Sequence, residues 1–279
     1  MNADRFGLVL AALAVLSVLA LLGQRLRRRA AQRRRGAQPF RDDWRTALRR
    51  HVPLYRRLPG ALRAQVERTA LVFAARVDFV GCNGLQVTDE MRLVVAVQAA
   101  LLVVKRNADA YRPLHSVLLY PDAFVVPIAE EDETGVVTEA QDVLAGQSIA
   151  TDSIVLSWPD VISTAPSAHA HNLVLHECAH FLDHVWGGTL STASSDAAST
   201  WHYTLGAEYA RLCRAVESGA QSLIDPYGSA DRAEFFAVAT EAFFERSDAL
   251  AKQNPELYAV LREFYGLNPI EWPAEGPTA

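Results

Sequence analysis

The sequence predicts an α+β fold with a mainly helical C-terminal half, preceded by one N-terminal transmembrane helix. Three observations lead to this prediction. Residues 6–23 carry no charge, strand-like and helix-like segments are mixed up to about residue 163, and helical spacing of apolar residues dominates after about residue 168. Because the strands and helices do not follow a repeating strand–helix–strand pattern, an α+β arrangement is favoured over a doubly wound sheet.

Composition limits the classes of function. The chain has 279 residues, of which 50% are apolar, and this is enough for a large core. The net charge is −5, but the first 35 residues hold eight arginines and one acid, so the rest of the chain is more acidic still. Direct nucleic-acid binding is not expected, because phosphate binding needs basic surface. The three cysteines, Cys82, Cys178 and Cys213, are widely spaced, which argues against a disulfide framework.

The N-terminal segment is predicted to anchor the chain in the cytoplasmic (inner) membrane. Its uncharged stretch FGLVLAALAVLSVLALLG is long enough to span a bilayer, for which about 17 residues are the lower limit. A cleaved signal peptide is the alternative, but QRLRRRAAQRRR follows where a small-residue cleavage site would stand. Arginines stay on the cytoplasmic side and contact anionic headgroups. We therefore expect a single-pass anchor over residues 1–35, a linker over 36–53 and a cytoplasmic domain over 54–279.

The first part of this domain is predicted to mix helices and strands. Pro59-Gly60 begins a helix that extends to about Arg76. A short strand, a Gly/Asn turn and a helix that starts after Thr88 follow. Residues 115–127 are β-rich, and residues 130–153 form an irregular loop or a short hairpin. The segment SIVLSWPDV is a strand, either at the edge of a sheet or in its core.

The second part is predicted to hold four main helices. The helical ranges are residues 169–187, closed by Gly187-Gly188, then 200–219, 232–246 and 254–266. The last of these begins with Asn254 as a cap and Pro255 at the first helical position.

One of these helices carries the motif H-E-x-x-H, within LVLHECAHFLDH. His176 and His180 are four residues apart, so they share one helix face and can chelate one cation. Glu177 lies one position further round, where it can accept a proton from a water molecule that the cation activates. Imidazole and carboxylate ligands indicate Zn²⁺. The alternative is a buried polar cluster with a structural role, but such a cluster is costly unless it is paired or binds a metal.

A catalytic site of this kind needs a third protein ligand. His184 follows on the same helix face, but it lies a turn too far along to complete a tetrahedron with both other histidines. The metzincin pattern would need Gly at position 183 and His at 186, where this chain has Asp183 and Trp186. His169 and His171 are interpreted as helix-entry or surface residues.

Acids on the downstream helices are the remaining candidates: Glu208, Glu217, Glu234, Glu241 and Glu245. The strongly apolar helix AEFFAVATEAFFE places three of these on one face, and buried acids there need a metal, a histidine or an arginine as partner. Spacing ranks Glu234 only slightly above Glu241 as the third ligand. Glu241 and Asp183 are candidates for bonding to a ligand histidine.

Four ordered segments together resemble the Mlc titration factor A family of zinc-dependent peptidases: LHECAHFLD, IDPYGSADRAEFFAVATEAFF, GLQVTDEMRLVVAVQAALL and IVLSWPDV. The resemblance covers about residues 54–272. The family is also similar in its active site to the catalytic domain of anthrax lethal factor. The resemblance implies a zincin-like metallopeptidase domain in which Glu234 is the third zinc ligand. It also implies a role for Tyr227, whose phenol would donate to a developing oxyanion or protonate the leaving group.

The expected function is zinc-dependent hydrolysis of peptide bonds, with Glu177 as general base and a peptide or protein as substrate. The alternative is a binding module that sequesters a transcriptional regulator, with weak or incidental peptidase activity. In the first case the strand SIVLSWPDV, if it lies at a sheet edge, could pair with extended substrate.

Overall fold

The computed structural model describes residues 38–273, with gaps at 107, 123, 132–136, 145, 151, 164–168 and 187–195. Within this part of the chain no helix is long and apolar enough to cross a membrane. The expected anchor over residues 1–35 and the closure at Gly187-Gly188 lie outside the described residues.

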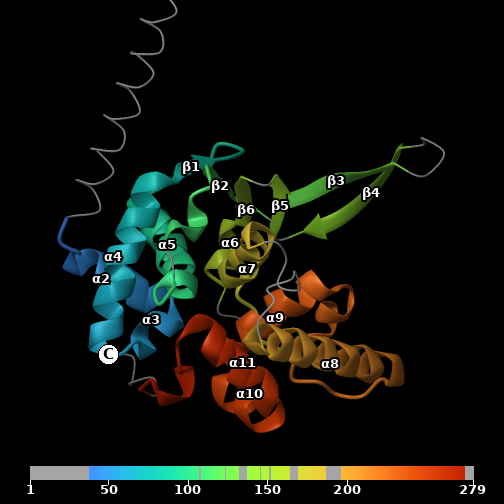
Figure 1. Cartoon of the computed structure of the whole chain (residues 1–279). Helices are drawn as coiled ribbons and strands as arrows, with labels where there is room; N and C mark the ends of the chain where they lie inside the picture. The colour runs from blue at the N-terminus through green and yellow to red at the C-terminus, as the bar shows by residue number, and fades with distance from the viewer. Residues whose placement is uncertain are drawn as a thin grey trace, which may run out of the picture.

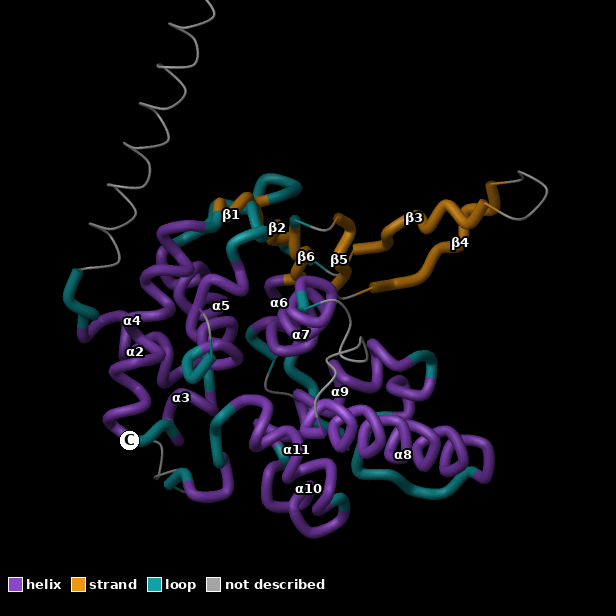
Figure 2. The backbone as a smooth tube through the Cα atoms, in the orientation of Figure 1, coloured by secondary structure: helices purple, strands orange, loops and turns teal. Residues whose placement is uncertain are grey.

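Helices make up most of the fold (Figure 2). The α-helices are α2 (Asp42–His51), α3 (Pro53–Arg57), α4 (Gly60–Arg76), α5 (Asp89–Val103), α6 (Trp158–Val161), α7 (Leu173–Val185), α8 (Asp196–Ser218), α9 (Arg232–Glu245), α10 (Ser247–Gln253) and α11 (Pro255–Tyr265). Short 3₁₀ turns are η1 (Ala108–Tyr111), η2 (Pro226–Ser229) and η3 (Pro269–Glu271).

The strands form a small mixed sheet and a separate hairpin. They are β1 (Asp78–Gly81), β2 (Ser116–Tyr120), β3 (Phe124–Glu131), β4 (Val137–Leu144), β5 (Gly146–Ala150) and β6 (Ser153–Ser157). The sheet has the order β1-β2-β6-β5, parallel except for the antiparallel pair β5–β6. The antiparallel β3–β4 hairpin projects away from the body (Figure 1). The α+β prediction is confirmed. The expected loop or short hairpin over residues 130–153 is only partly right, because this range holds the end of β3, all of β4 and β5, and the first residue of β6.

The segment SIVLSWPDV provides β6, which lies between β2 and β5. The core alternative for this strand is therefore confirmed, and the edge alternative is wrong. A strand that is hydrogen-bonded to a neighbour on each side has no free row of backbone N–H and C=O groups with which another chain could pair. Within the described part of the sheet, the edge next to β6 belongs to β5 instead.

Helix α5 is the hydrophobic centre of the N-terminal part. Every residue of α5 from Leu93 to Val103 is buried. Its start follows the expected cap, since the Thr88 side chain accepts a hydrogen bond from the backbone N–H of Met91. Helix α5 packs against α4 on one side and against α7 on the other, so it links the N-terminal helices to the helix that carries the H-E-x-x-H motif.

Helix α2 lies within residues 36–53, the range expected to be a linker. Its Leu48 is fully buried, and Phe40 and Trp44 pack against the same core. This part of the range packs with the domain through α5.

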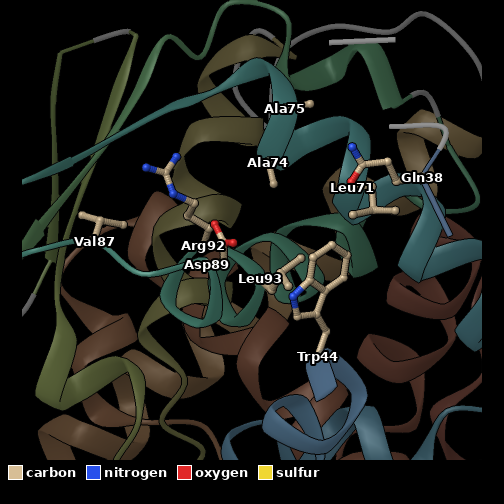
Figure 3. A pocket seen from close by; sticks show the side chains of 9 residues that line it. All are labelled: Gln38, Trp44, Leu71, Ala74, Ala75, Val87, Asp89, Arg92 and Leu93. Atoms are coloured by element: carbon tan, nitrogen blue, oxygen red, sulfur yellow. The ribbon is translucent and has the colours of Figure 1, made fainter. Parts of the chain in front are cut away.

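A cavity of about 400 Å³ lies where α2, α4 and the start of α5 meet. Figure 3 shows Trp44, Leu71 and Leu93 gathered at its apolar part, with Asp89 and Arg92 nearby. No residue that lines this cavity belongs to the H-E-x-x-H motif.

Candidate metal centre

Helix α7 presents His176 and His180 on one face. The helix begins at Leu173, four residues later than the sequence analysis predicted, because Asn172 caps it: its side chain accepts a hydrogen bond from the backbone N–H of Leu175, 3.1 Å away. The apolar residues of α7 are buried against α9, α5 and the strands β5 and β6, and this packing fixes the direction of the helix. Both histidines are half-buried.

Helix α9 presents Glu234 in its first turn. The Asp231 side chain caps this helix by accepting from the backbone N–H groups of Ala233 and Glu234, at 2.8 and 2.9 Å. Four buried phenylalanines, Phe235, Phe236, Phe243 and Phe244, hold α9 in the core. Since α9 packs directly on α7, the first turn of α9 lies beside the two histidines.

Three side-chain atoms converge at this contact between helices. Nε2 of His176 lies 3.1 Å from Nε2 of His180. Oε2 of Glu234 lies 3.1 Å from the former and 3.3 Å from the latter. Nevertheless, this buried oxygen forms no hydrogen bond with any described neighbour. The three atoms thus lie within 3.3 Å of one another.

The spacing fits a metal ion. Four ligands at about 2.0–2.1 Å from a tetrahedral ion stand about 3.3 Å apart, which is close to the three measured distances. In the described part of the chain these side chains form one group of potential ligands that lie within 4.8 Å of one another. The residues present are thus suited to hold a cation, with room for a non-protein ligand.

Glu177 lies next to this group on α7 and is 3% exposed. Its Oε2 is buried and has no hydrogen-bond partner among the described residues. Burial raises the pKa of Glu177 to about 7, although His176 and His180 act in the opposite direction. A carboxylate whose pKa lies near neutrality can both accept and return a proton.

Glu241 bonds the second ring nitrogen of His176, the one outside the group of three converging atoms. Its Oε1 lies 2.8 Å from Nδ1 of His176. A carboxylate acceptor places the proton on Nδ1 and leaves the lone pair of Nε2 for a metal. Glu241 is 2% exposed, and its other oxygen accepts from the backbone N–H of Asn172. The expectation that Glu241 bonds a ligand histidine agrees with this geometry.

Tyr227 reaches the site from η2. The centre of its ring lies 6.2 Å from that of His176, and the side chain is 52% exposed. Burial and the nearby Glu234 and Glu177 carboxylates raise the pKa of Tyr227, so its hydroxyl stays protonated. Gly228 brings the turn close to α9, because a Cβ atom there would lie 2.5 Å from Cγ2 of Val238.

The other candidate residues lie elsewhere or have other partners. His184 and Glu217 are exposed. Glu208 accepts from Asn254 at 2.6 Å and pairs with Arg211 at 3.2 Å. Glu245 accepts from the side chain of Asn172 at 2.8 Å.

Three more residues flank the motif without joining the group. Asp183 is buried at the end of α7. His169 lies 3.7 Å from Asp225, and His171 is exposed. Both histidines lie before the first residue of α7 and are not part of the helix.

Sequence reasoning missed Asn172. The signal was present, because Asn is a preferred cap and stands directly before an apolar helical run. It was missed because the helix was predicted to begin at residue 169, which placed Asn172 inside the helix instead of at its cap.

Comparisons with known proteins agree with the site. The sequence profile of the glucose-regulated metallo-peptidase M90 family matches residues 24–266. An uncharacterized protein of Synechocystis, slr2042, is 34% identical over 238 residues, which cover 84% of this chain and 86% of the relative. Mlc titration factor A of Serratia proteamaculans is 30% identical over 238 residues, 82% of this chain and 88% of that protein. Mlc titration factor A of Escherichia coli O127:H6 is 30% identical over 233 residues, which cover 82% of this chain and 87% of that protein.

A metallopeptidase family implies a bound metal ion, and His176, His180 and Glu234 are the described residues suited to hold it. The resemblance seen in the sequence is confirmed over most of the chain. The chain belongs to the glucose-regulated metallo-peptidase M90 family.

Proposed function

We propose that this chain is a zinc-dependent peptidase, in which His176, His180 and Glu234 hold the ion and Glu177 is the general base. The observation that carries this proposal is the convergence of three ligand atoms, 3.1–3.3 Å apart, beside a buried carboxylate oxygen without a partner. Two imidazoles and one carboxylate are a typical ligand set of zinc peptidases with an open fourth position.

A zinc ion held there would supply Lewis acidity and would lower the pKa of a water molecule to about 7. Glu177 accepts the proton of the attacking water and passes it to the leaving amine. Its buried position favours this role, because a desolvated carboxylate is more basic than a solvated one. The Tyr227 hydroxyl donates a hydrogen bond to the oxyanion that develops on the scissile carbonyl.

We further propose that extended substrate binds along β5. This strand is antiparallel to β6 and lies at the edge of the described sheet, and α7 packs against it. An edge strand offers backbone groups to which a peptide can add as a further strand.

The test uses the domain from residue 38 onward, as wild type, Glu177→Gln and Glu234→Ala. We expect about one zinc per chain in wild type and Glu177→Gln, strongly reduced zinc in Glu234→Ala, and hydrolysis only by wild type. Elemental analysis and cleavage of peptides with free and with blocked N-termini measure these properties, and the second also separates aminopeptidase from endopeptidase action. Zinc retained by Glu234→Ala would refute the ligand assignment, and bound zinc without hydrolysis of any peptide would refute the peptidase.

A second candidate function is the binding of a transcriptional regulator, since relatives at 30% identity are named Mlc titration factor A. In this case Glu177→Gln would bind an Mlc-type regulator as tightly as wild type does. A pull-down of such a regulator with both forms separates this function from catalysis.

We also retain the anchor as a proposal. Residues 1–35 would hold the chain in the cytoplasmic (inner) membrane as a single pass, and the domain over residues 54–279, joined by α2, would face the cytoplasm. The support is the uncharged stretch of residues 6–23 followed by seven arginines. Membrane fractionation of the full chain, compared with a chain lacking residues 1–35, tests it.

A further inference from the structure

Asn172 joins three helices at one point. It is the N-cap of α7, and its side chain lies between α5 and α9. Its Nδ2 donates to Oε1 of Gln98 on α5 at 2.7 Å and to Oε1 of Glu245 on α9 at 2.8 Å. Its Oδ1 accepts from the backbone N–H of Leu175. A cap needs only this last bond, so the two donated bonds serve another purpose.

The side chain that accepts on α5 is itself held in place. Gln98 is 4% exposed, and its Nε2 donates to the backbone carbonyl of Val94 at 3.0 Å. This bond leaves Oε1 of Gln98 directed at Asn172. A buried amide that bonds at both ends has one orientation, which makes it a rigid support.

The backbone of Asn172 leads to the metal centre. Its N–H donates to Oε2 of Glu241, whose Oε1 accepts from Nδ1 of His176. Both oxygens of Glu241 are thereby engaged, and its carboxylate plane is fixed relative to the imidazole. Asn172 also accepts, through its carbonyl, from the backbone N–H of His176 at 3.0 Å.

We propose that Asn172 is a positioning residue of the metal centre: by bonding Gln98 and Glu245 it holds its own N–H on Glu241, and Glu241 in turn orients His176. The inference rests on the proposed function, because it assigns His176 to a bound ion. Asn172 contacts none of the three ligand atoms; its N–H reaches them through Glu241, and its carbonyl makes a backbone bond to His176 that side-chain substitutions keep.

The experiment measures the zinc affinity of the full-length chain by competition with a chromophoric chelator. Asn172→Ser keeps a capping oxygen but removes both donated bonds. We expect it to weaken zinc binding about 10-fold, and Glu241→Gln to weaken it about 10- to 100-fold, which is the usual range for residues that orient a metal ligand. The double variant should be no weaker than Glu241→Gln alone, because coupled residues do not act additively.

The matched control is Thr88→Ala, which removes the N-cap of α5 away from the metal centre. We expect it to lower the melting temperature and leave the zinc affinity within about twofold of wild type. If Asn172→Ser does not fold, Gln98→Leu removes a single acceptor of Nδ2 and should still weaken zinc binding. The inference is overturned if Asn172→Ser, or in its place Gln98→Leu, binds zinc as tightly as Thr88→Ala. It is equally overturned if the effects of Asn172→Ser and Glu241→Gln add in full.

Zinc affinity separates this inference from the peptidase proposal. A wild-type chain that binds zinc but hydrolyses no peptide would refute the peptidase proposal. The role of Asn172 would then still be decided by the affinities alone.

Discussion

Two buried glutamates, Glu67 and Glu177, occupy opposite situations in this molecule. Glu67 is 5% exposed, and it accepts two hydrogen bonds from Arg45, at 2.9 and 2.8 Å, and one from the Tyr55 hydroxyl at 2.6 Å. Glu177 is 3% exposed, and its Oε2 has no partner among the described residues. Burial acts to raise the pKa of both acids, but the bonds from Arg45 and Tyr55 lower that of Glu67, whereas that of Glu177 rises to about 7.

The difference separates an acid with a structural role from one for which we propose a catalytic role. A buried charge that is hydrogen-bonded joins its own element to those that supply its donors: Glu67 joins α4 to α2 and α3. A buried charge without donors costs free energy of folding, and such groups persist where chemistry needs them. Burial alone therefore does not identify a site; what distinguishes Glu177 is an oxygen without a partner among the described residues, next to the two histidines of the motif.

The largest expected effect comes from exchanging each acid for its amide. Glu177→Gln should lower kcat/KM about 10³-fold, the contribution typical of a general base, while the free energy of unfolding of the metal-free domain stays equal or rises. Glu67→Gln should lower the free energy of unfolding by about 2 to 3 kcal/mol, because Arg45 and Tyr55 lose a charged acceptor, and leave kcat/KM unchanged. Urea unfolding and peptide cleavage measure both properties.

Each acid has a tyrosine nearby, Tyr55 for Glu67 and Tyr227 for Glu177. Removing the hydroxyl of each tyrosine should change stability or activity by less than replacing the acid does. Tyr55→Phe should lower the free energy of unfolding by about 1 to 2 kcal/mol, since it removes a hydrogen bond to a buried carboxylate. Tyr227→Phe should lower kcat about 10²- to 10³-fold with KM unchanged, as expected for the loss of one hydrogen-bond donor to an oxyanion. A Tyr227→Phe enzyme with wild-type kcat would show that Tyr227 has no role in the mechanism. Each variant is the control for the other, because urea unfolding should change only for Tyr55→Phe and kcat only for Tyr227→Phe.

The smallest effect is a pH dependence of stability. The pKa of Glu67 is lowered in the folded state, so its stabilising contribution is present above the unfolded value of about 4.3 and is lost as pH falls through the folded value. The difference in unfolding free energy between wild type and Glu67→Gln should be constant from about pH 6 to 8 and should shrink below about pH 4. A difference that remained constant down to pH 3 would show that the charge of Glu67 contributes nothing.

Sequence patterns predicted the local features of this fold. The sequence predicted the α4 and α5 helices and the cap at Thr88. It also predicted that His176 and His180 share one face, because a helix repeats every 3.6 residues. The predicted helix termini were less accurate. Helix α7 begins at Leu173, four residues after the predicted start, because the side-chain bond of Asn172 decides which residue is the cap.

The sequence by itself determined the motif on α7, the acidic face of α9 and the mixed α+β class. Only the tertiary structure decided which acid joins the histidines. Glu234 and Glu241 are seven residues apart on one face of α9, so helical spacing hardly distinguishes them. The packing of α9 on α7 puts Glu234 beside both Nε2 atoms and Glu241 behind His176 on its Nδ1 side. Tertiary packing also placed β6 inside the sheet, because strand order depends on contacts between residues far apart in the chain.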